Sequence, residues 1–171
     1  MMPKAVLIGP PGAGKSSVAR ALSKLLDCEV LDTDLEIERK SGKKIAEIFT
    51  QDGEPAFRIL EKEVVLNALA TASGVIALGG GSVLDAEVAD YLSKSSIPVA
   101  YLEVSISQAA PRVGFNKERP LLAINPRQQW MALMEVRRPI YEGLATFKIA
   151  TDNRKPAEVA QEIATSIGSI K

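Results

Sequence analysis

The stretch that decides the fold of this chain is Gly9-Pro10-Pro11-Gly12-Ala13-Gly14-Lys15-Ser16, which directly follows the apolar run Ala5-Val6-Leu7-Ile8. A short strand followed by the pattern GxxxxGK[ST] is typical of a phosphate-binding loop, or P-loop, that opens a helix. The glycines let successive backbone N–H groups point at an anion, and the positive N-terminal end of the helix adds to the attraction. We therefore expect the phosphates of a nucleotide to bind to Gly12, Ala13, Gly14, Lys15, Ser16 and Ser17.

Two side chains of this loop have separate expected roles. Lys15 would reach the β- and γ-phosphates as a flexible point charge, and the hydroxyl of Ser16 would take one position on Mg²⁺. ATP and Mg²⁺ are therefore the expected cofactors. An ordinary glycine-rich turn is the alternative, and the strand before the loop and the helical pattern after it argue against that alternative.

Composition limits the other classes of function. The chain has 171 residues, 46% of them hydrophobic, which suits a single domain over residues 1–171. Its 21 basic residues equal its 21 acidic ones, so we expect no nucleic-acid partner. With no histidine and one cysteine, Cys28, the sequence excludes an intrachain disulfide, Cys/His zinc sites and Ser-His-Asp catalysis. Proton transfer must then use a carboxylate or a lysine.

The N-terminal residues and the hydropathy of the chain indicate its cellular compartment. Met1-Met2-Pro3-Lys4 runs straight into the first strand, and no apolar stretch approaches the length of a membrane span. We expect a soluble cytoplasmic protein that acts as a monomer and does not bind a membrane.

Five short apolar runs alternate with segments of helical period, which predicts an α/β fold with a parallel sheet. The predicted strands are Ala5–Ile8, Glu29–Leu31, Val75–Leu78, Val99–Val104 and Phe147–Ala150. The first helix should begin at Lys15 or Ser16 and bury Val18, Leu22, Leu25 and Leu26. The last should begin near Pro156 and bury Val159, Ile163 and Ile167.

Two insertions interrupt the alternation of strands and helices. Residues 32–74 are more than one crossover needs, and Ser41-Gly42 and Asp52-Gly53-Glu54-Pro55 divide them into about three helical pieces. Residues 114–126 are rich in Gly, Asn, Pro and charge, which predicts a mobile functional loop.

Two carboxylates follow the second predicted strand. In Leu31-Asp32-Thr33-Asp34, strand alternation would place Asp32 and Asp34 on one side, at the carboxyl edge of the sheet where open α/β folds bind ligands. One carboxylate could hold Mg²⁺ and the other could meet a substrate. The alternative is that one of them caps the helix that follows.

Three glycines follow the third predicted strand. In many P-loop enzymes an acidic Mg²⁺ ligand ends this strand, whereas this chain has Gly79-Gly80-Gly81. The glycines expose backbone N–H groups and permit close approach of a ligand, although a plain tight turn is the alternative.

Three arginines are candidates for binding an anion. Arg58 and Arg137 are each equally compatible with solvated surface positions when taken alone. Arg119 lies in the predicted mobile loop, where it could close over a transferring phosphoryl group.

Taken in order, these motifs resemble the shikimate kinase family across nearly the whole length. The matching features are the P-loop, Asp32-Thr33-Asp34, Phe57-Arg58 with Glu61, Gly79-Gly80-Gly81, Arg119-Pro120-Leu121-Leu122, and Arg137-Arg138-Pro139 with Tyr141. The resemblance implies a three-layer P-loop kinase fold with strand order 2-3-1-4-5. It also implies ATP-dependent phosphorylation of the 3-hydroxyl of shikimate, with a substrate-binding region near residues 33–61 and a lid near residues 112–125.

The resemblance also implies roles for particular residues. Arg58 and Arg137 would grip the substrate carboxylate, with Arg138 an open alternative to Arg137. Asp34 and Gly80 would contact the ring hydroxyls, and Gly79 and Gly81 would also belong to the substrate-binding site. Adenine would lie between Arg112 and the turn formed by Arg154 and Pro156. The expected catalytic residues are Lys15, Asp34 and Arg119, with Ser16 and Asp32 as metal ligands and Arg119 also touching the nucleotide.

Two other functions remain compatible with part of this pattern. A gluconate or nucleoside monophosphate kinase would share the P-loop, but we would not expect it to combine Asp32-Thr33-Asp34 with three glycines and Arg-Pro-Leu-Leu. A nucleotide-dependent switch protein would hydrolyse ATP without an acceptor.

Overall fold

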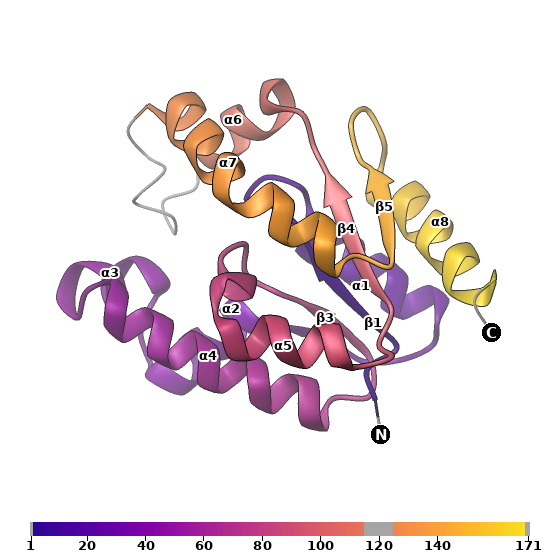
Figure 1. The fold of residues 1–171 in the computed structure, drawn as a ribbon, viewed down its shortest axis with the longest axis horizontal. Helices are drawn as coiled ribbons and strands as arrows, with labels where there is room; N and C mark the ends of the chain where they lie inside the picture. The colour runs from indigo at the N-terminus through magenta and orange to yellow at the C-terminus, as the bar shows by residue number, and fades with distance from the viewer. Residues whose placement is uncertain (1, 115–124, 170–171) are drawn as a thin grey trace.

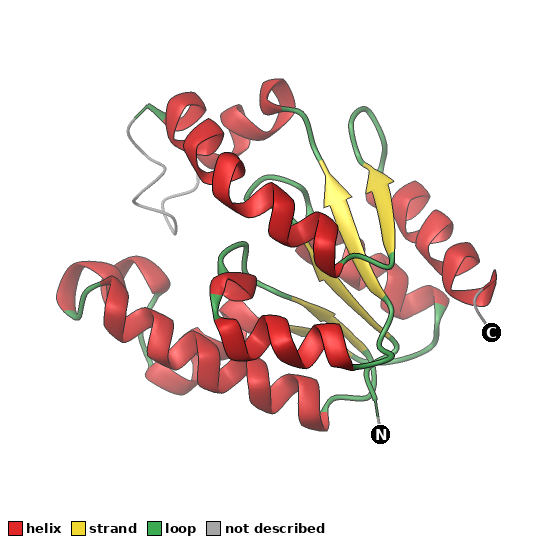
Figure 2. Ribbon diagram, viewed as in Figure 1, coloured by secondary structure: helices red, strands yellow, loops and turns green. Residues whose placement is uncertain are grey.

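The sheet organises the molecule. In a computed structural model that describes residues 2–114 and 125–169, five parallel strands lie in the order β2-β3-β1-β4-β5 (Figures 1 and 2). The strands are β1 (Ala5–Ile8), β2 (Val30–Asp32), β3 (Val75–Ala77), β4 (Val99–Glu103) and β5 (Phe147–Ala150). The α/β fold and the predicted strand order are both confirmed.

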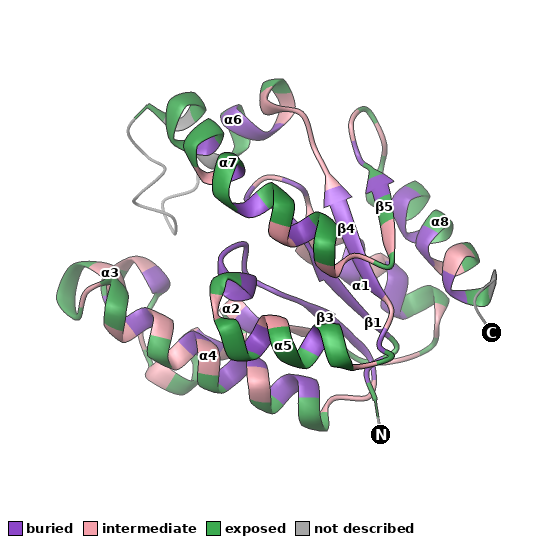
Figure 3. Cartoon of the chain, in the orientation of Figure 1, coloured by how far each residue is buried: buried purple, intermediate pink, exposed green. Residues whose placement is uncertain are grey.

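Helices cover both faces of this sheet. The described helices are α1 (Lys15–Leu25), α2 (Thr33–Ser41), α3 (Ile45–Gln51), α4 (Glu54–Thr71), α5 (Ala86–Lys94), α6 (Ile106–Gly114), α7 (Pro126–Leu144) and α8 (Pro156–Ser169), with the short 3₁₀ helix η1 (Ser82–Leu84). One core joins α1 and α8 to the sheet, and a second joins α4, α5 and α7 to its other face. Figure 3 shows the resulting pattern: β1, β3 and most of β4 are buried, and the helices are buried on one side only.

The helical faces follow the apolar periodicity, with one exception. Val18 and Leu22 are buried in α1, and Val159 and Ile163 are buried in α8. Leu25, predicted to be buried, is 50% exposed. At 100° per residue the buried face of α1 centres on Ala19, Leu22 and Ser23, so Leu25 lies at its edge and lines an open groove between α1 and α8.

The long insertion forms three helices, as its punctuation predicts. The side chain of Asp32 accepts from the first turn of α2, and Gly42 ends that helix with φ 72°. A small separate core joins α2, α3 and α4, built from Ile37, Ile45, Ile48, Phe57 and Val64. The insertion is thus a rigid attachment and not an irregular loop.

Strand register brings the catalytic loops together. Ala77 pairs with Leu7 on one side and with Asp32 on the other, so β1, β2 and β3 end at the same level. The segments that follow these strands therefore emerge side by side at one edge of the sheet. In the part of the chain that the structure describes, no helix is both long and apolar enough to cross a membrane.

Candidate active site

The P-loop joins β1 to α1 and surrounds the N-terminus of that helix. Gly14 precedes the helix in the left-handed region, with φ 87°, and accepts from the N–H of Val18. Gly12 has φ 88°, and a methyl carbon placed on it would lie 3.0 Å from the Cα of Ala109, so only glycine fits there. The loop is thus a backbone cradle at a helix N-terminus, which is a geometry that binds anions.

Lys15 lines this cradle. Its Nζ donates to the carbonyl oxygens of Gly9 and Pro10, at 2.7 and 3.1 Å. The cavity beside it measures about 380 Å³ and is lined by both the P-loop and the two aspartates of the α2 start. A mobile ammonium group at that position can reach the terminal phosphates of a nucleotide.

Ser16 and Asp32 meet at the floor of the same cavity. The Oγ of Ser16 donates to Oδ2 of Asp32, while Oδ1 of Asp32 accepts from the backbone N–H of Asp34 at 2.9 Å and of Leu35 at 3.3 Å. The capping role of Asp32 is therefore confirmed, because Oδ1 caps α2. Its role as a metal ligand stays a prediction, with Oδ2 facing the P-loop hydroxyl.

Asp34 lies in a helix and not in the strand where it was predicted. The prediction that strand alternation places Asp32 and Asp34 on one side is wrong, because β2 ends at Asp32 and Asp34 lies in the first turn of α2. Both carboxylates nevertheless line the 380 Å³ cavity. The helix turn, and not strand alternation, places them together.

The three consecutive glycines are where the functional side chains converge. A methyl carbon on Gly79 would lie 2.7 Å from Oδ1 of Asp34. One on Gly80 would lie 3.2 Å from Nη1 of Arg137, and one on Gly81 would lie 2.6 Å from Nη1 of Arg58. Each glycine thus makes room for a different charged side chain, so the glycines permit close packing. Their role in binding a ligand stays a prediction.

Arg58 is held by a buried carboxylate. Its Nη1 donates to Oε1 of Glu61 at 2.6 Å, and Ser82 donates its hydroxyl to Oε2 of Glu61 at 3.1 Å. Burial raises the pKa of Glu61, the guanidinium of Arg58 opposes this, and the charge of Asp34 adds to it. The side chain of Arg58 remains 31% exposed, so its guanidinium is still accessible to an anion.

The structure distinguishes the two adjacent arginines of α7. Arg137 is 7% exposed and lies against Gly80 and so beside the other converging side chains, whereas Arg138 is exposed. Burial raises the pKa of Tyr101, and a hydrogen bond from Arg138 opposes that effect, which places Arg138 on the Tyr101 side of α7. Arg137 is therefore the arginine that joins the cluster.

The predicted adenine residues gather around a second cavity. Arg112, Arg154 and Pro156 line a space of about 240 Å³ that also touches the P-loop. Nη1 of Arg112 donates to the carbonyl of Gly12 at 2.6 Å, and Arg154 pairs with Glu162 at 2.8 Å. The base-binding role of these residues stays a prediction.

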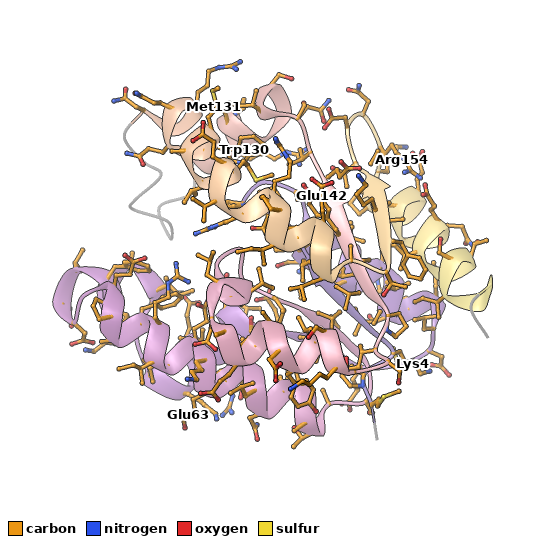
Figure 4. All side chains as sticks on the ribbon, viewed as in Figure 1. Lys4, Glu63, Trp130, Met131, Glu142 and Arg154 are labelled. Atoms are coloured by element: carbon orange, nitrogen blue, oxygen red, sulfur yellow. The ribbon has the colours of Figure 1, made fainter. Side chains whose placement is uncertain are left out.

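Sequence reasoning overlooked two side chains that shape the site. Thr33, fully buried, accepts from the N–H of Gly79 at 3.2 Å and donates to the carbonyl of Ala77 at 3.3 Å. Trp130, labelled on α7 in Figure 4, donates its indole N–H to the carbonyl of Pro11 at 3.0 Å. The buried indole needs a hydrogen-bond acceptor, but nothing in the sequence says which one it finds.

Most of the lid predicted near residues 112–125 lies outside the residues that the structure describes. Arg119 and residues 115–124 lie outside the described residues, whereas Arg112 lies within α6. The role of Arg119 therefore stays a prediction.

The fold and this site define a P-loop kinase, with phosphate cradle, paired aspartates and an arginine cluster at one sheet edge. The family described as shikimate kinase matches residues 11–168, so the chain belongs to the shikimate kinase family. Shikimate kinases of Rhodococcus jostii and Thermobifida fusca are 47% and 50% identical to it, over 98% and 96% of this chain and 99% and 95% of theirs.

Solved structures agree with the family assignment. Shikimate kinase from Acinetobacter baumannii, in complex with shikimate, has a TM-score of 0.94 at 37% identity and covers 100% of this chain and 95% of its own. A gluconokinase from Sinorhizobium meliloti has a TM-score of 0.57 at 18% identity, with 98% of this chain and 92% of its own covered. The second similarity is one of fold alone.

Proposed function

We propose that this protein transfers the γ-phosphoryl group of ATP to the 3-hydroxyl of shikimate, giving shikimate 3-phosphate and ADP. The observation that carries the proposal is the pair of guanidinium groups of Arg58 and Arg137, set on adjacent glycines beside Asp34. Two guanidinium groups suit a carboxylate, and an aspartate suits a ring hydroxyl. The Acinetobacter baumannii relative is a complex with shikimate, which supports the same acceptor here.

The donor side divides the nucleotide between two cavities. The phosphates lie on the P-loop residues Gly12, Ala13, Gly14, Lys15, Ser16 and Ser17, and the base lies against Arg112, Arg154 and Pro156. Both cavities share Gly14, Ser17 and Arg112, which supports one ligand that spans them.

Ser16 and Asp32 fit a magnesium ion. Their oxygens meet on the cavity floor, and Mg²⁺ takes oxygen ligands but few of them from the protein. No group of three acidic, His or Cys side chains could hold a metal within residues 2–114 and 125–169, so the phosphates complete such a site. When bound, Mg²⁺ neutralises negative charge on the phosphates.

In the reaction, the 3-oxygen of shikimate forms a bond to the γ-phosphorus while the bond from that phosphorus to the bridging oxygen of ADP breaks. Lys15 balances the charge that develops on the transferring group. Asp34 orients the attacking hydroxyl and accepts its proton, which is transferred late, as the new oxygen–phosphorus bond forms in a loose transition state. Arg58 and Arg137 hold the ring so that the correct hydroxyl faces the phosphate.

The direct test is an assay with ATP and shikimate that measures both ADP and phosphorylated product. We expect shikimate 3-phosphate in a 1:1 ratio to ADP, and an Asp34→Asn variant that binds ATP normally but loses about 100-fold or more in turnover. Gluconate and nucleoside monophosphates serve as competing acceptors. Preferred turnover of either, or ADP release with no phosphorylated product, would contradict the proposal.

We also infer that the enzyme works as a cytoplasmic monomer without a nucleic-acid partner. Its equal numbers of basic and acidic residues, 21 each, support the absence of a nucleic-acid partner. Light scattering during size-exclusion chromatography should give a mass near 18.3 kDa, and a dimer mass would contradict a monomer.

A further inference from the structure

Tyr141 of α7 donates a hydrogen bond to the turn formed by Gly79, Gly80 and Gly81, called the glycine turn below. Its hydroxyl donates to the carbonyl oxygen of Gly80 at 2.7 Å, and the residue is fully buried. Tyr141 lies one helical turn after Arg137, so both side chains reach Gly80 from the same face of α7. Arg137 has a proposed role in binding the substrate carboxylate, whereas Tyr141 has no role in the reaction described above.

The turn itself has little internal restraint at its centre. The N–H of Gly79 is held by Thr33, its carbonyl by the N–H of Ser82, and the carbonyl of Gly81 by the N–H of Leu84. Among the described residues, the hydroxyl of Tyr141 provides the one hydrogen bond to the peptide unit between Gly80 and Gly81. That unit has a glycine on both sides, so no Cβ restricts its rotation.

Rotation of this unit would change what the turn presents to a ligand. In a planar trans peptide the carbonyl and the following N–H point in opposite directions. A hydrogen bond to the Gly80 carbonyl therefore also sets the direction of the Gly81 N–H, which points away from Tyr141. A flipped peptide would instead offer a carbonyl oxygen there, which repels the oxygens of an anionic ligand.

We propose that Tyr141 is a positioning residue: its hydroxyl holds the Gly80–Gly81 peptide in the orientation that binds the phosphoryl acceptor. This inference rests on the proposed function for the identity of the acceptor. The residue does not touch the reacting atoms, and its effect passes through the glycine backbone.

The packing around Tyr141 makes its hydroxyl a precise anchor. Its ring lies against that of Tyr101, with centroids 5.2 Å apart, and both rings belong to the core between the sheet and α7. A buried ring in a fixed rotamer holds its hydroxyl in one place. Phenylalanine would fill the same space, so the packing role and the anchoring role can be separated.

The first experiment compares Tyr141→Phe with Tyr101→Phe, a matched loss of one buried hydroxyl that faces Arg138 and not the turn. For Tyr141→Phe we expect KM for shikimate to rise about tenfold and KM for ATP to change by less than about twofold. Tyr101→Phe should leave both constants near those of the wild type. An unchanged KM for shikimate, or an equal rise in both constants, would overturn the proposal.

The second measurement does not depend on which acceptor the enzyme uses. The chain has 12 glycines, so labelling with ¹⁵N-glycine gives a simple amide spectrum. Without any substrate, we expect one sharp Gly81 signal in the wild type and a broadened or doubled signal in Tyr141→Phe. A broadened or doubled wild-type signal, or a single sharp signal in the variant, would overturn the anchoring role.

The kinetic and NMR measurements distinguish a failure of the proposed function from a failure of the positioning role of Tyr141. If the wild type does not phosphorylate shikimate, the proposed function fails while the amide spectra still decide whether Tyr141 fixes the turn. If the wild type does phosphorylate shikimate and Tyr141→Phe is kinetically normal, the positioning role alone fails. If Tyr141→Phe does not fold, a broadened or doubled Gly81 signal in the wild type would still overturn the anchoring role.

Discussion

The nucleotide half and the acceptor half of this site are built in different ways. The phosphate cradle is a continuous stretch of backbone from β1 into α1, and Lys15 belongs to that stretch. The acceptor half brings Asp34, Arg58, Glu61 and Arg137 from three separate helices onto one glycine turn. The first half is made of backbone dipoles, whereas the second is made of charged side chains that are buried (Glu61 and Arg137) or half-buried (Asp34 and Arg58).

This difference determines how selective each half is for its ligand. A backbone cradle binds any phosphate chain, because its N–H groups are the same whatever the sequence between the glycines. Side-chain clusters recognise one acceptor, because buried charges left without a counter-charge are costly. Donor binding is therefore generic to P-loop proteins, and acceptor choice is particular to this family.

Helix α7 connects the halves. Near its start Trp130 (Figure 4) donates to Pro11 in the P-loop. Near its end Tyr141 donates to Gly80 in the glycine turn. The P-loop and the glycine turn are thus both hydrogen-bonded to the same helix.

The largest expected effect lies in the nucleotide half. Lys15→Ala should lower kcat about 100- to 1,000-fold, because the ammonium balances charge that develops in the transition state. The free energy of unfolding should change by about 0.5 kcal/mol or less, because Lys15 faces the cavity and not the core. Steady-state kinetics and urea unfolding on one preparation measure both. Normal turnover in a folded Lys15→Ala protein would refute the role given to the cradle.

The next effect tests the side chains of the acceptor half. Arg137→Ala should raise KM for shikimate about 10- to 100-fold, the equivalent of one charge-assisted hydrogen bond, and leave KM for ATP nearly unchanged. Arg138→Ala is the matched control, since Arg138 is the exposed neighbour on the same helix. Equal effects of the two substitutions would mean that burial of Arg137 has nothing to do with acceptor binding.

A smaller effect tests the glycine turn. In Gly81→Ala the new methyl would sit 2.6 Å from Nη1 of Arg58, so the guanidinium must move. We expect KM for shikimate to rise about fivefold, since a displaced Arg58 keeps part of its interaction. Gly143→Ala, with nothing within 4 Å, is the control and should stabilise α7 by about 0.5–1 kcal/mol with unchanged kinetics. Normal shikimate kinetics in Gly81→Ala would show that this glycine is not needed for space.

The smallest effect concerns stability as a function of pH. Burial raises the pKa of Glu61 in the folded protein above the ordinary 4.5, so the folded state binds the proton more tightly than the unfolded chain. The stability that this group contributes is therefore complete below pH 4.5 and falls as the pH rises through the raised pKa. Glu61→Gln cannot titrate and should lack this fall.

Urea unfolding of both proteins between about pH 4 and pH 8 measures this difference. The free energy of unfolding of the wild type minus that of Glu61→Gln should decrease as the pH rises. A difference that stays constant, or grows, would show that burial does not raise the pKa of this carboxyl. The nucleotide half has no equivalent buried carboxyl in the described residues of the core, so its substitutions should show no such slope.

The sequence by itself determined the parts that depend on neighbours along the chain. The P-loop, the five strands and the three helices of the insertion all follow from local patterns of glycine, apolar period and turn residues, because short-range geometry controls them. Asp32, Ser16 and Lys15 were identifiable for the same reason: each lies at a defined step from a strand end or a helix start. Family resemblance supplied the strand order and the substrate residues.

The tertiary structure alone decided which distant side chains meet. Nothing local distinguishes Arg137 from Arg138, and only the packing of α7 on the sheet turns the first toward Gly80 and the second toward Tyr101. The hydrogen-bond partners of Trp130 and Tyr141 could not be predicted either, since each partner lies more than 60 residues away along the chain. Contacts of this kind depend on how whole helices seat against the sheet, and that seating is set by the packing of the entire core.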